Sequence, residues 1–197
     1  NRSSDLCEKL QIYDLAREGG WDWNIYFDSD TLVHPETIDW TEHLKKDTVA
    51  QNGHDFSSVR HRHDKYFLRD GRNIGTCGWL TIASDWCLDL WHPCEDMTPQ
   101  EVVDCCYLTV DERNSGVMDR SHLSDDYIMS RNIARYGLKY ETITEMHKRL
   151  FPNGSGGTFV NFLWHAYTIT EEEKVQQLRE ILDQWALHPD HVRNVAE

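Results

Sequence analysis

The sequence contains no apolar run near the roughly 20 residues that a helix needs to cross a bilayer, so no membrane span is expected within it. It has no C-x-x-C pair, which argues against a structural zinc site. Its formal net charge is −14 and it lacks a basic stripe, so nucleic acid is not an expected partner. No signal peptide is recognisable either, although the abrupt start leaves room for a removed upstream segment.

What the chain does have is the composition of a folded protein. It is 197 residues long, with 39% hydrophobic and 27% charged residues, a balance typical of globular domains. No repeat, low-complexity tract or linker interrupts it, so we expect one domain spanning residues 1–197. The excess of acidic residues suits a protein that recruits divalent cations to carry a phosphorylated substrate.

The six cysteines leave the compartment open. An even number permits disulfides, such as Cys94 with Cys105 or Cys106, whereas Cys77 and Cys87 lie in apolar segments typical of buried free thiols. Two N-x-S sequons begin at residues 1 and 153, and they would matter only in a secretory lumen. Neither the cytoplasm nor a secretory lumen is excluded as the location.

Local patterns predict strands that alternate with helices, which indicates an α/β domain. A capping box starts a first helix at Asp5, and Gly19-Gly20 ends it. A short apolar and aromatic strand follows over residues 23–27. A second buried strand is expected over residues 79–83.

The second half of the chain carries clearer helix signals. Ser84 and Ser124 are expected to cap the next two helices, of which the second ends at Gly137. Residues 139–143 are a strand candidate, and a capping box at Thr170 starts the last helix. The apolar stripe of that helix is expected to consist of Val175, Leu178, Leu182 and Trp185.

The strongest chemical signal lies in WDWNIYFDSDTLVHP, residues 21–35. The strand delivers Asp28 and Asp30 to the point where the chain leaves the sheet, which is where open α/β sheets bind ligands. Alternation places both carboxylates on one side of the chain, with Ser29 opposite. Two hard oxygen ligands so arranged suit Mn²⁺ or Mg²⁺. The alternative interpretation is a polar turn, because aspartate and serine are common turn residues.

Two weaker candidates lie later in the chain. Asp125 and Asp126 stand at a helix start, where the macrodipole keeps a carboxylate ionised and able to take a proton from an acceptor hydroxyl. The same Ser-Asp-Asp triplet is also an ordinary N-terminal cap. His165 ends the apolar run NFLWH, where a histidine is more often packed in the core than a ligand. For His61 and His63 a solvated loop is the preferred interpretation.

Taken in this order, these pieces resemble the GT-A fold glycosyltransferases, over about residues 5–167. Asp28-Ser29-Asp30 matches the D-x-D motif of that superfamily, and GTCGWL at residues 75–80 resembles the strand that lines its donor and acceptor pocket. Asp125-Asp126 matches the acidic motif at a helix start. His165 matches the late histidine that completes the metal shell.

The resemblance implies a mixed, mainly parallel sheet flanked by helices, and transfer of a sugar from a UDP- or GDP-sugar to a hydroxyl of a glycan or protein acceptor. It implies that Asp28, Asp30 and His165 bind Mn²⁺ or Mg²⁺, and that Asp126 or Asp125 is the general base. The donor-binding residues that it implies are Asp28, Ser29, Asp30, Gly78 and Trp79.

Individual residues in this set have competing interpretations. Gly78 lets the backbone approach the donor or acceptor closely. Trp79 and Trp164 either offer flat faces to sugar rings or pack in the core.

Finer features of the resemblance disagree. Residues 75–91, GTCGWLTIASDWCLDLW, also resemble the retaining galactosyl- and mannosyltransferases of plants and fungi, whereas Ser-Asp-Asp with the downstream RYGLK resembles inverting families and favours inversion. GT-A domains begin with a strand, a helix and a strand before the D-x-D motif, and here only one helix precedes it. Either the chain begins within the domain or that half is supplied differently, so no base-binding residues are assigned.

Two other functions remain open. Residues 25–32, IYFDSDTL, resemble motif I of the haloacid-dehalogenase phosphatases, which are Mg²⁺-dependent, although Leu32 stands where that family has threonine. A non-catalytic sugar- or metal-binding module is the third interpretation, and the intact acidic pair and late histidine argue against it. An EF-hand is excluded, because Val33 and Asp39 occupy the positions of its glycine and glutamate.

Overall fold

The computed structural model describes residues 11–34, 37–51, 79–106, 108, 113–114, 120–150, 152, 163–165 and 170–187. A few of these are described through their backbone only, namely His122, Thr144, His147, Leu187 and residues 163–165. The strands are β1 (Trp23–Phe27), β2 (Thr31–Val33), β3 (Thr48–Gln51), β4 (Leu80–Ser84), β5 (Lys139–Thr142) and β6 (Leu163–His165). The main helices are α1 (Gln11–Gly19), α4 (Pro99–Asp104), α6 (Ser124–Tyr136), α7 (Ile143–Leu150), α9 (Glu171–Leu187) and the 3-10 helices η2 (Trp40–Glu42), η5 (Asp85–Trp91) and η6 (Arg120–Leu123).

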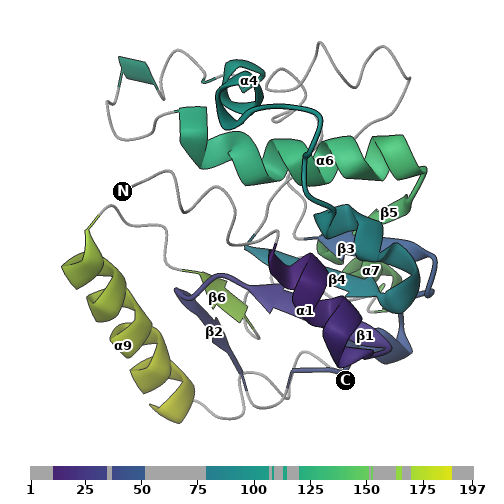
Figure 1. Ribbon diagram of the computed structural model, residues 1–197. Coiled ribbons are helices and arrows are strands. Elements are labelled where there is room, and N and C mark those ends of the chain that lie inside the picture. Colours follow the sequence, from purple (N-terminus) through teal and green to yellow (C-terminus); the bar gives the residue numbers. More distant parts are fainter. Residues whose placement is uncertain are drawn as a thin grey trace.

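Four of the strands form one mixed sheet in the order β1-β4-β3-β5, with helices around it (Figure 1). The predicted α/β class is therefore confirmed. β4 pairs antiparallel with both β1 and β3, whereas β3 pairs parallel with β5. The expectation of a mainly parallel sheet is wrong for the described strands, because two of these three pairings are antiparallel.

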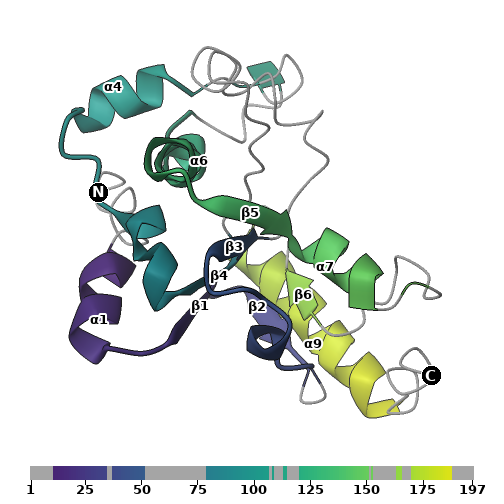
Figure 2. The ribbon, with the colours of Figure 1, turned by 90° about the vertical axis from the view of Figure 1, so that its right-hand side faces the viewer.

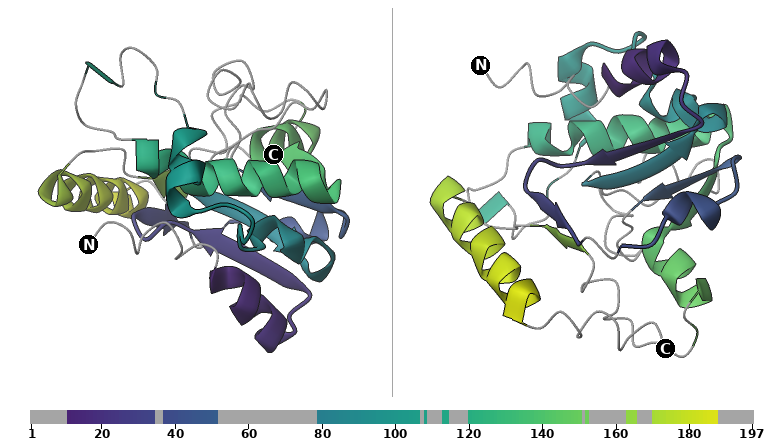
Figure 3. Two further views of the ribbon diagram at one scale, coloured as in Figure 1. Left: turned by 45° about the horizontal axis from the view of Figure 1, so that its top comes forward. Right: turned by 90° about the horizontal axis from the view of Figure 1, so that it is seen from below.

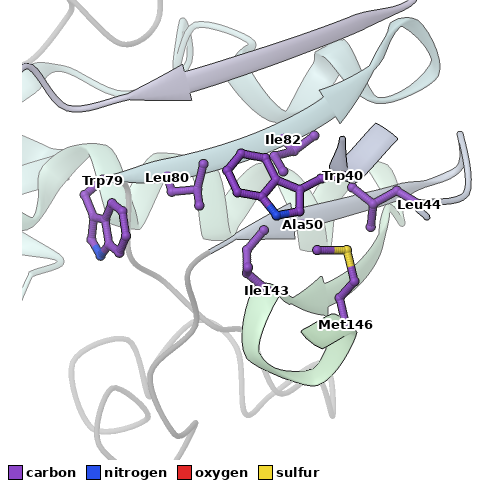
Figure 4. Packing of buried hydrophobic residues seen from close by; sticks show 8 residues of the cluster. All are labelled: Trp40, Leu44, Ala50, Trp79, Leu80, Ile82, Ile143 and Met146. Carbon is purple, nitrogen blue, oxygen red and sulfur yellow. The ribbon is translucent and has the colours of Figure 1, made fainter. Parts of the chain in front are cut away.

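Helices cover both faces of this sheet (Figure 2). Alternation along the strands sends Val49 and Ala83 to one face, where they pack with residues of η5 and α6. Ala50 and Ile82 point to the other face, where they pack with residues of η2 and α7. The buried cluster on this second face consists of Trp40, Leu44, Ala50, Trp79, Leu80, Ile82, Ile143 and Met146 (Figure 4). β4 is buried along its whole length, as expected for the central part of a layered core.

Several local predictions are confirmed by the structure. β1 has the predicted bounds, β4 begins one residue later than expected, and β5 ends at Thr142. Gly137 ends α6 in the left-handed region at φ 67°, and Gly20 follows α1 at φ 61°. The predicted start of the first helix at Asp5 lies outside the described residues.

The two serines that were expected to cap helices behave differently. Ser84 is a cap, since its Oγ accepts a hydrogen bond of 3.1 Å from the backbone N–H of Trp86. The helix that it starts is a 3-10 helix with a kink at Cys87. Ser124 is not a cap, because the chain is already helical before it: η6 precedes α6, and Ser124 Oγ donates to the carbonyl of Ser121.

The cysteines of the described part are free thiols. They are Cys87, Cys94, Cys105 and Cys106. The suggested disulfide from Cys94 is therefore absent, whereas the prediction of a buried free thiol at Cys87 is confirmed. Burial raises the pKa of Cys87 to about 11, which keeps it protonated at neutral pH. The other two cysteines, Cys7 and Cys77, lie outside the described residues.

α9 begins as predicted but packs through a different face. Hydrogen bonds in both directions between Thr170 and Glu173 confirm the capping box. Val175 and Leu182 are 45% and 49% exposed, so the predicted stripe is wrong at these two positions. The half-buried face instead consists of Lys174, Gln177, Leu178, Ile181 and Trp185, which recur at spacings of three and four residues.

None of the helices in the described ranges is both long enough and apolar enough to cross a membrane.

Candidate functional site

The candidate site lies at one edge of the four-stranded sheet, where β1, β3 and β5 end at Phe27, Gln51 and Thr142. We call this the carboxyl edge. The strand registers align these ends, since Phe27 pairs with Leu80, and Gln51 pairs with both Thr81 and Thr142. This is the kind of edge at which α/β sheets bind ligands.

Asp28, Ser29 and Asp30 form a tight turn directly beyond β1, which we call the acidic turn. A hydrogen bond of 3.1 Å from the N–H of Thr31 to the carbonyl of Asp28 closes it. The N–H of Asp28 donates to the carbonyl of Trp79 at 2.9 Å, which ties the turn to the start of β4. Asp28 and Asp30 are half-buried and Ser29 is exposed.

Each carboxylate of the acidic turn is held by a different partner. The hydroxyl of Tyr26 donates to Asp28 Oδ1 at 2.5 Å. Lys174 Nζ, from α9, donates to Asp30 Oδ2 at 2.6 Å. This hydrogen bond is the chief reason that the pKa of Lys174 lies above its usual value, and the nearby charges of Asp30, Glu171 and Asp28 add to it. The acidic turn is therefore a region of negative potential, and the cation that it binds in this structure is the ammonium of Lys174.

His165 is brought to the acidic turn by the pairing of β2 with β6. These two strands form a separate antiparallel sheet in which Thr31 lies opposite His165. Because Thr31 follows Asp30 directly, the backbone of His165 lies beside the acidic turn although the two are far apart in the sequence. Figure 1 shows β6 beside β2. The structure thus places three predicted ligand residues in one neighbourhood. The imidazole of His165 is outside the described atoms.

α9 lies along β2 and is fixed at both of its ends (Figure 3). Lys174 contacts Asp30 just before β2, and Trp185 packs edge-on against His34 just after it, with ring centroids 4.8 Å apart. α9 therefore supports the small sheet that carries His165.

Replacing Trp185 with alanine tests this support. We expect Trp185→Ala to destabilise the docking of α9 by about 1–2 kcal/mol, because a half-buried aromatic contact is lost. Hydrogen exchange of the α9 amides should accelerate selectively. Leu182→Ala, at a 49% exposed position on the same helix, is the matched control and should leave exchange nearly unchanged. Equal exchange rates in the two variants would contradict the docking.

The predicted general base also lies at the carboxyl edge. α6 ends at the tight turn of Gly137, which joins it to the start of β5 (Figure 1), and its N-terminal half reaches the carboxyl edge through Met129. Gln51 Nε2, at the end of β3, approaches Met129 Sδ at 3.5 Å and ties this end of the helix to the sheet. Asp125 and Asp126 lie in the first turn of α6, with Asp126 Oδ1 shielded from solvent.

The remaining predicted site residues have mixed outcomes. Trp79 is only 5% exposed and lies at one end of the core cluster (Figure 4), so the structure shows the core-packing alternative for this ring. Its contribution to the site is the carbonyl that accepts from Asp28. Gly78, the histidines at positions 61 and 63, and the side chain of Trp164 lie outside the described part.

The donor set suits a divalent cation. Two carboxylates from one turn supply hard oxygen ligands, and the ammonium of Lys174 on Asp30 already stands where a positive charge would bind. No cluster of three or more His, Cys, Asp or Glu side chains that could hold a metal ion exists among the described side chains. The third predicted ligand, the imidazole of His165, lies outside the described side chains.

Sequence reasoning missed three residues that shape the site, namely Tyr26, Gln51 and Lys174. For Lys174 a signal did exist: the lysine follows Glu171–Glu173 at the start of a helix, where the macrodipole disfavours a cation. This pattern marks the lysine as unusual, but it does not identify Asp30 as the partner. For Tyr26 and Gln51, no local pattern distinguishes them from ordinary strand residues.

Comparison with known proteins gave no match to the chain. No protein-family model matches the chain. Neither the curated proteins nor the solved structures give a significant match.

Proposed function

We propose that the chain is a metal-dependent glycosyltransferase, which moves a sugar from a nucleoside-diphosphate sugar to an acceptor hydroxyl. One observation carries the proposal: the pairing of β2 with β6 sets His165 opposite Thr31, and so beside Asp28 and Asp30. A simple polar turn after a strand needs no such neighbour. The resemblance to GT-A enzymes, with its D-x-D motif and late histidine, provides the class.

The residues that would hold Mn²⁺ or Mg²⁺ are Asp28, Asp30 and His165. When bound, the metal supplies positive charge that offsets the charge of a departing diphosphate. Tyr26 holds the carboxylate of Asp28 by its hydroxyl, and the turn hydrogen bond from Thr31 fixes the spacing of the two acids. The chain itself thus organises the two oxygen ligands in advance.

Asp126, or its neighbour Asp125, is the proposed general base. Both stand in the first turn of α6 at the carboxyl edge, where the helix macrodipole favours a carboxylate. The base takes the proton from the acceptor hydroxyl as that oxygen attacks the anomeric carbon. A single attack of this kind, opposite the leaving group, inverts the anomeric configuration, so we propose an inverting enzyme.

A panel of UDP- and GDP-sugars, each with Mn²⁺ or with EDTA, tests the function through thermal unfolding. A donor present at 100 times its Kd stabilises the folded state by about 2.7 kcal/mol, so the unfolding midpoint should rise with at least one donor and only with Mn²⁺. If no donor raises the midpoint, or if EDTA makes no difference, the proposal is wrong. Formation of an aspartyl-phosphate analogue with beryllofluoride would instead support a phosphatase.

A further inference from the structure

Lys174 is an enclosed cation at the acidic turn. Its Nζ lies 2.6 Å from Asp30 Oδ2, with the two side chains 25% and 19% exposed. Lys46 and Lys139, which also pair with aspartates, are 35% and 67% exposed. Because the Lys174 pair is more enclosed, it is screened less by solvent than an ordinary surface pair.

The position of Lys174 is set by a rigid element. The capping box at Thr170 fixes the start of α9, and the contact of Trp185 with His34 fixes its far end. Between them, the face that carries Lys174 packs toward β2. The ammonium is therefore presented to Asp30 by the fold, and only its four-carbon stem needs to move for the contact to break.

A divalent cation at the acidic turn would meet this ammonium. Two positive groups on one carboxylate repel each other, and the repulsion is larger where water is partly excluded. The electrostatic field favours the doubly charged ion, whereas the attachment of Lys174 to α9 favours the ammonium. Binding of the metal to Asp30 and binding of Lys174 to Asp30 therefore oppose each other.

We propose that Lys174 is a built-in counter-ion of the cation site: its ammonium neutralises Asp30 when no metal is bound, and a divalent ion binds by displacing it. This inference rests on the proposed function, since it takes the acidic turn as the cation site. It makes Lys174 a positioning residue that lowers metal affinity and keeps the acidic pair compensated before the metal arrives.

The test is the affinity for Mn²⁺ alone, measured by electron paramagnetic resonance of the free ion. Lys174→Gln is expected to bind Mn²⁺ about fivefold more tightly than the wild type, because no ammonium competes for Asp30. Lys174→Arg keeps the charge and should remain near the wild-type affinity. Lys139→Gln is the control. Lys139 stands at the start of β5 and pairs with Asp47, so its removal should leave the Mn²⁺ affinity unchanged.

The outcomes separate the two proposals. If Asp30→Asn loses Mn²⁺ binding but Lys174→Gln binds no more tightly than the wild type, the counter-ion role is overturned and the cation site stands. The same conclusion follows if Lys139→Gln tightens binding as much, since the effect would then be one of net charge. If neither the wild type nor Lys174→Gln binds Mn²⁺, both proposals fail.

Discussion

Replacing Asp30 with asparagine should abolish Mn²⁺ binding at the acidic turn and reduce sugar transfer by at least about 100-fold. Loss of a residue that only supports a ligand costs roughly 10–100-fold, so loss of a direct ligand should cost at least as much. Asparagine keeps the size of the side chain and one oxygen for Lys174, so the fold should persist. The measurement is Mn²⁺-dependent transfer beside Mn²⁺ affinity.

Asp47→Asn is the matched control for this change. Asp47 also pairs with a lysine, Lys139, but lies next to the start of β3 instead of at the carboxyl edge. It should keep transfer and Mn²⁺ affinity within about twofold of the wild type. Transfer that survives Asp30→Asn, or that falls equally in both variants, would contradict the assignment of the acidic turn.

The largest stability effect is expected from Asp96→Asn. Arg131 on α6 has a side chain only 5% exposed, and it donates to both oxygens of Asp96, one of them at 2.9 Å. Removing the anion leaves a buried guanidinium without this partner. We expect a loss of roughly 2 kcal/mol, less than the about 3–5 kcal/mol for a fully buried pair because Asp96 is 49% exposed.

Urea unfolding measures this loss as a lower midpoint at an unchanged slope. Asp104→Asn is the control, since Asp104 and Arg120 are 3.8 Å apart and both about half exposed. It should cost less than about 0.5 kcal/mol. Equal costs for Asp96→Asn and Asp104→Asn would show that the Arg131 pair does not fasten this part of the chain to α6.

The same pair predicts a pH dependence. The hydrogen bond from Arg131 is the main reason that the pKa of Asp96 falls to about 2, from the usual 3.8. Since the folded-state pKa is lowered, the stabilisation is fully present above about pH 4 and is lost as the pH falls toward 2. The stability difference between wild type and Asp96→Asn should therefore shrink over this range. A constant difference from pH 6 to pH 2 would contradict the lowered pKa.

The parts of the fold that were predicted are those that depend on near neighbours in the chain. The bounds of β1, the left-handed Gly137 and the capping box at Thr170 all follow from short patterns. Strand direction cannot be predicted from short patterns, because it depends on pairing between segments that are distant in the sequence, such as Trp23 with Ser84. The antiparallel pairings were therefore missed while the α/β class was predicted.

The docked face of α9 shows a second limit. Apolar residues occur on two overlapping stripes of this helix, and the predicted stripe shares Leu178 and Trp185 with the docked one. The choice between them is made by contacts outside the helix, of Lys174 with Asp30 and of Trp185 with His34. Periodicity alone reports amphipathicity and does not report which neighbour the helix meets.

For the candidate site, the ligand residues were easier to predict than the side chains that contact them. Asp28, Asp30 and His165 were chosen by residue type and order, and the pairing of β2 with β6 brings their backbones together. The ammonium that Asp30 binds in the folded chain comes from a helix more than one hundred residues away in the sequence, which no local pattern connects to it.

Anomalous diffraction at the manganese edge, from crystals grown with Mn²⁺ and a nucleoside diphosphate, is the most direct test of the central claim. We predict one strong peak within bonding distance of Asp28, Asp30 and the imidazole of His165, with the Lys174 ammonium displaced from Asp30. A peak elsewhere, or none at the acidic turn while the imidazole of His165 points away from it, would contradict the account.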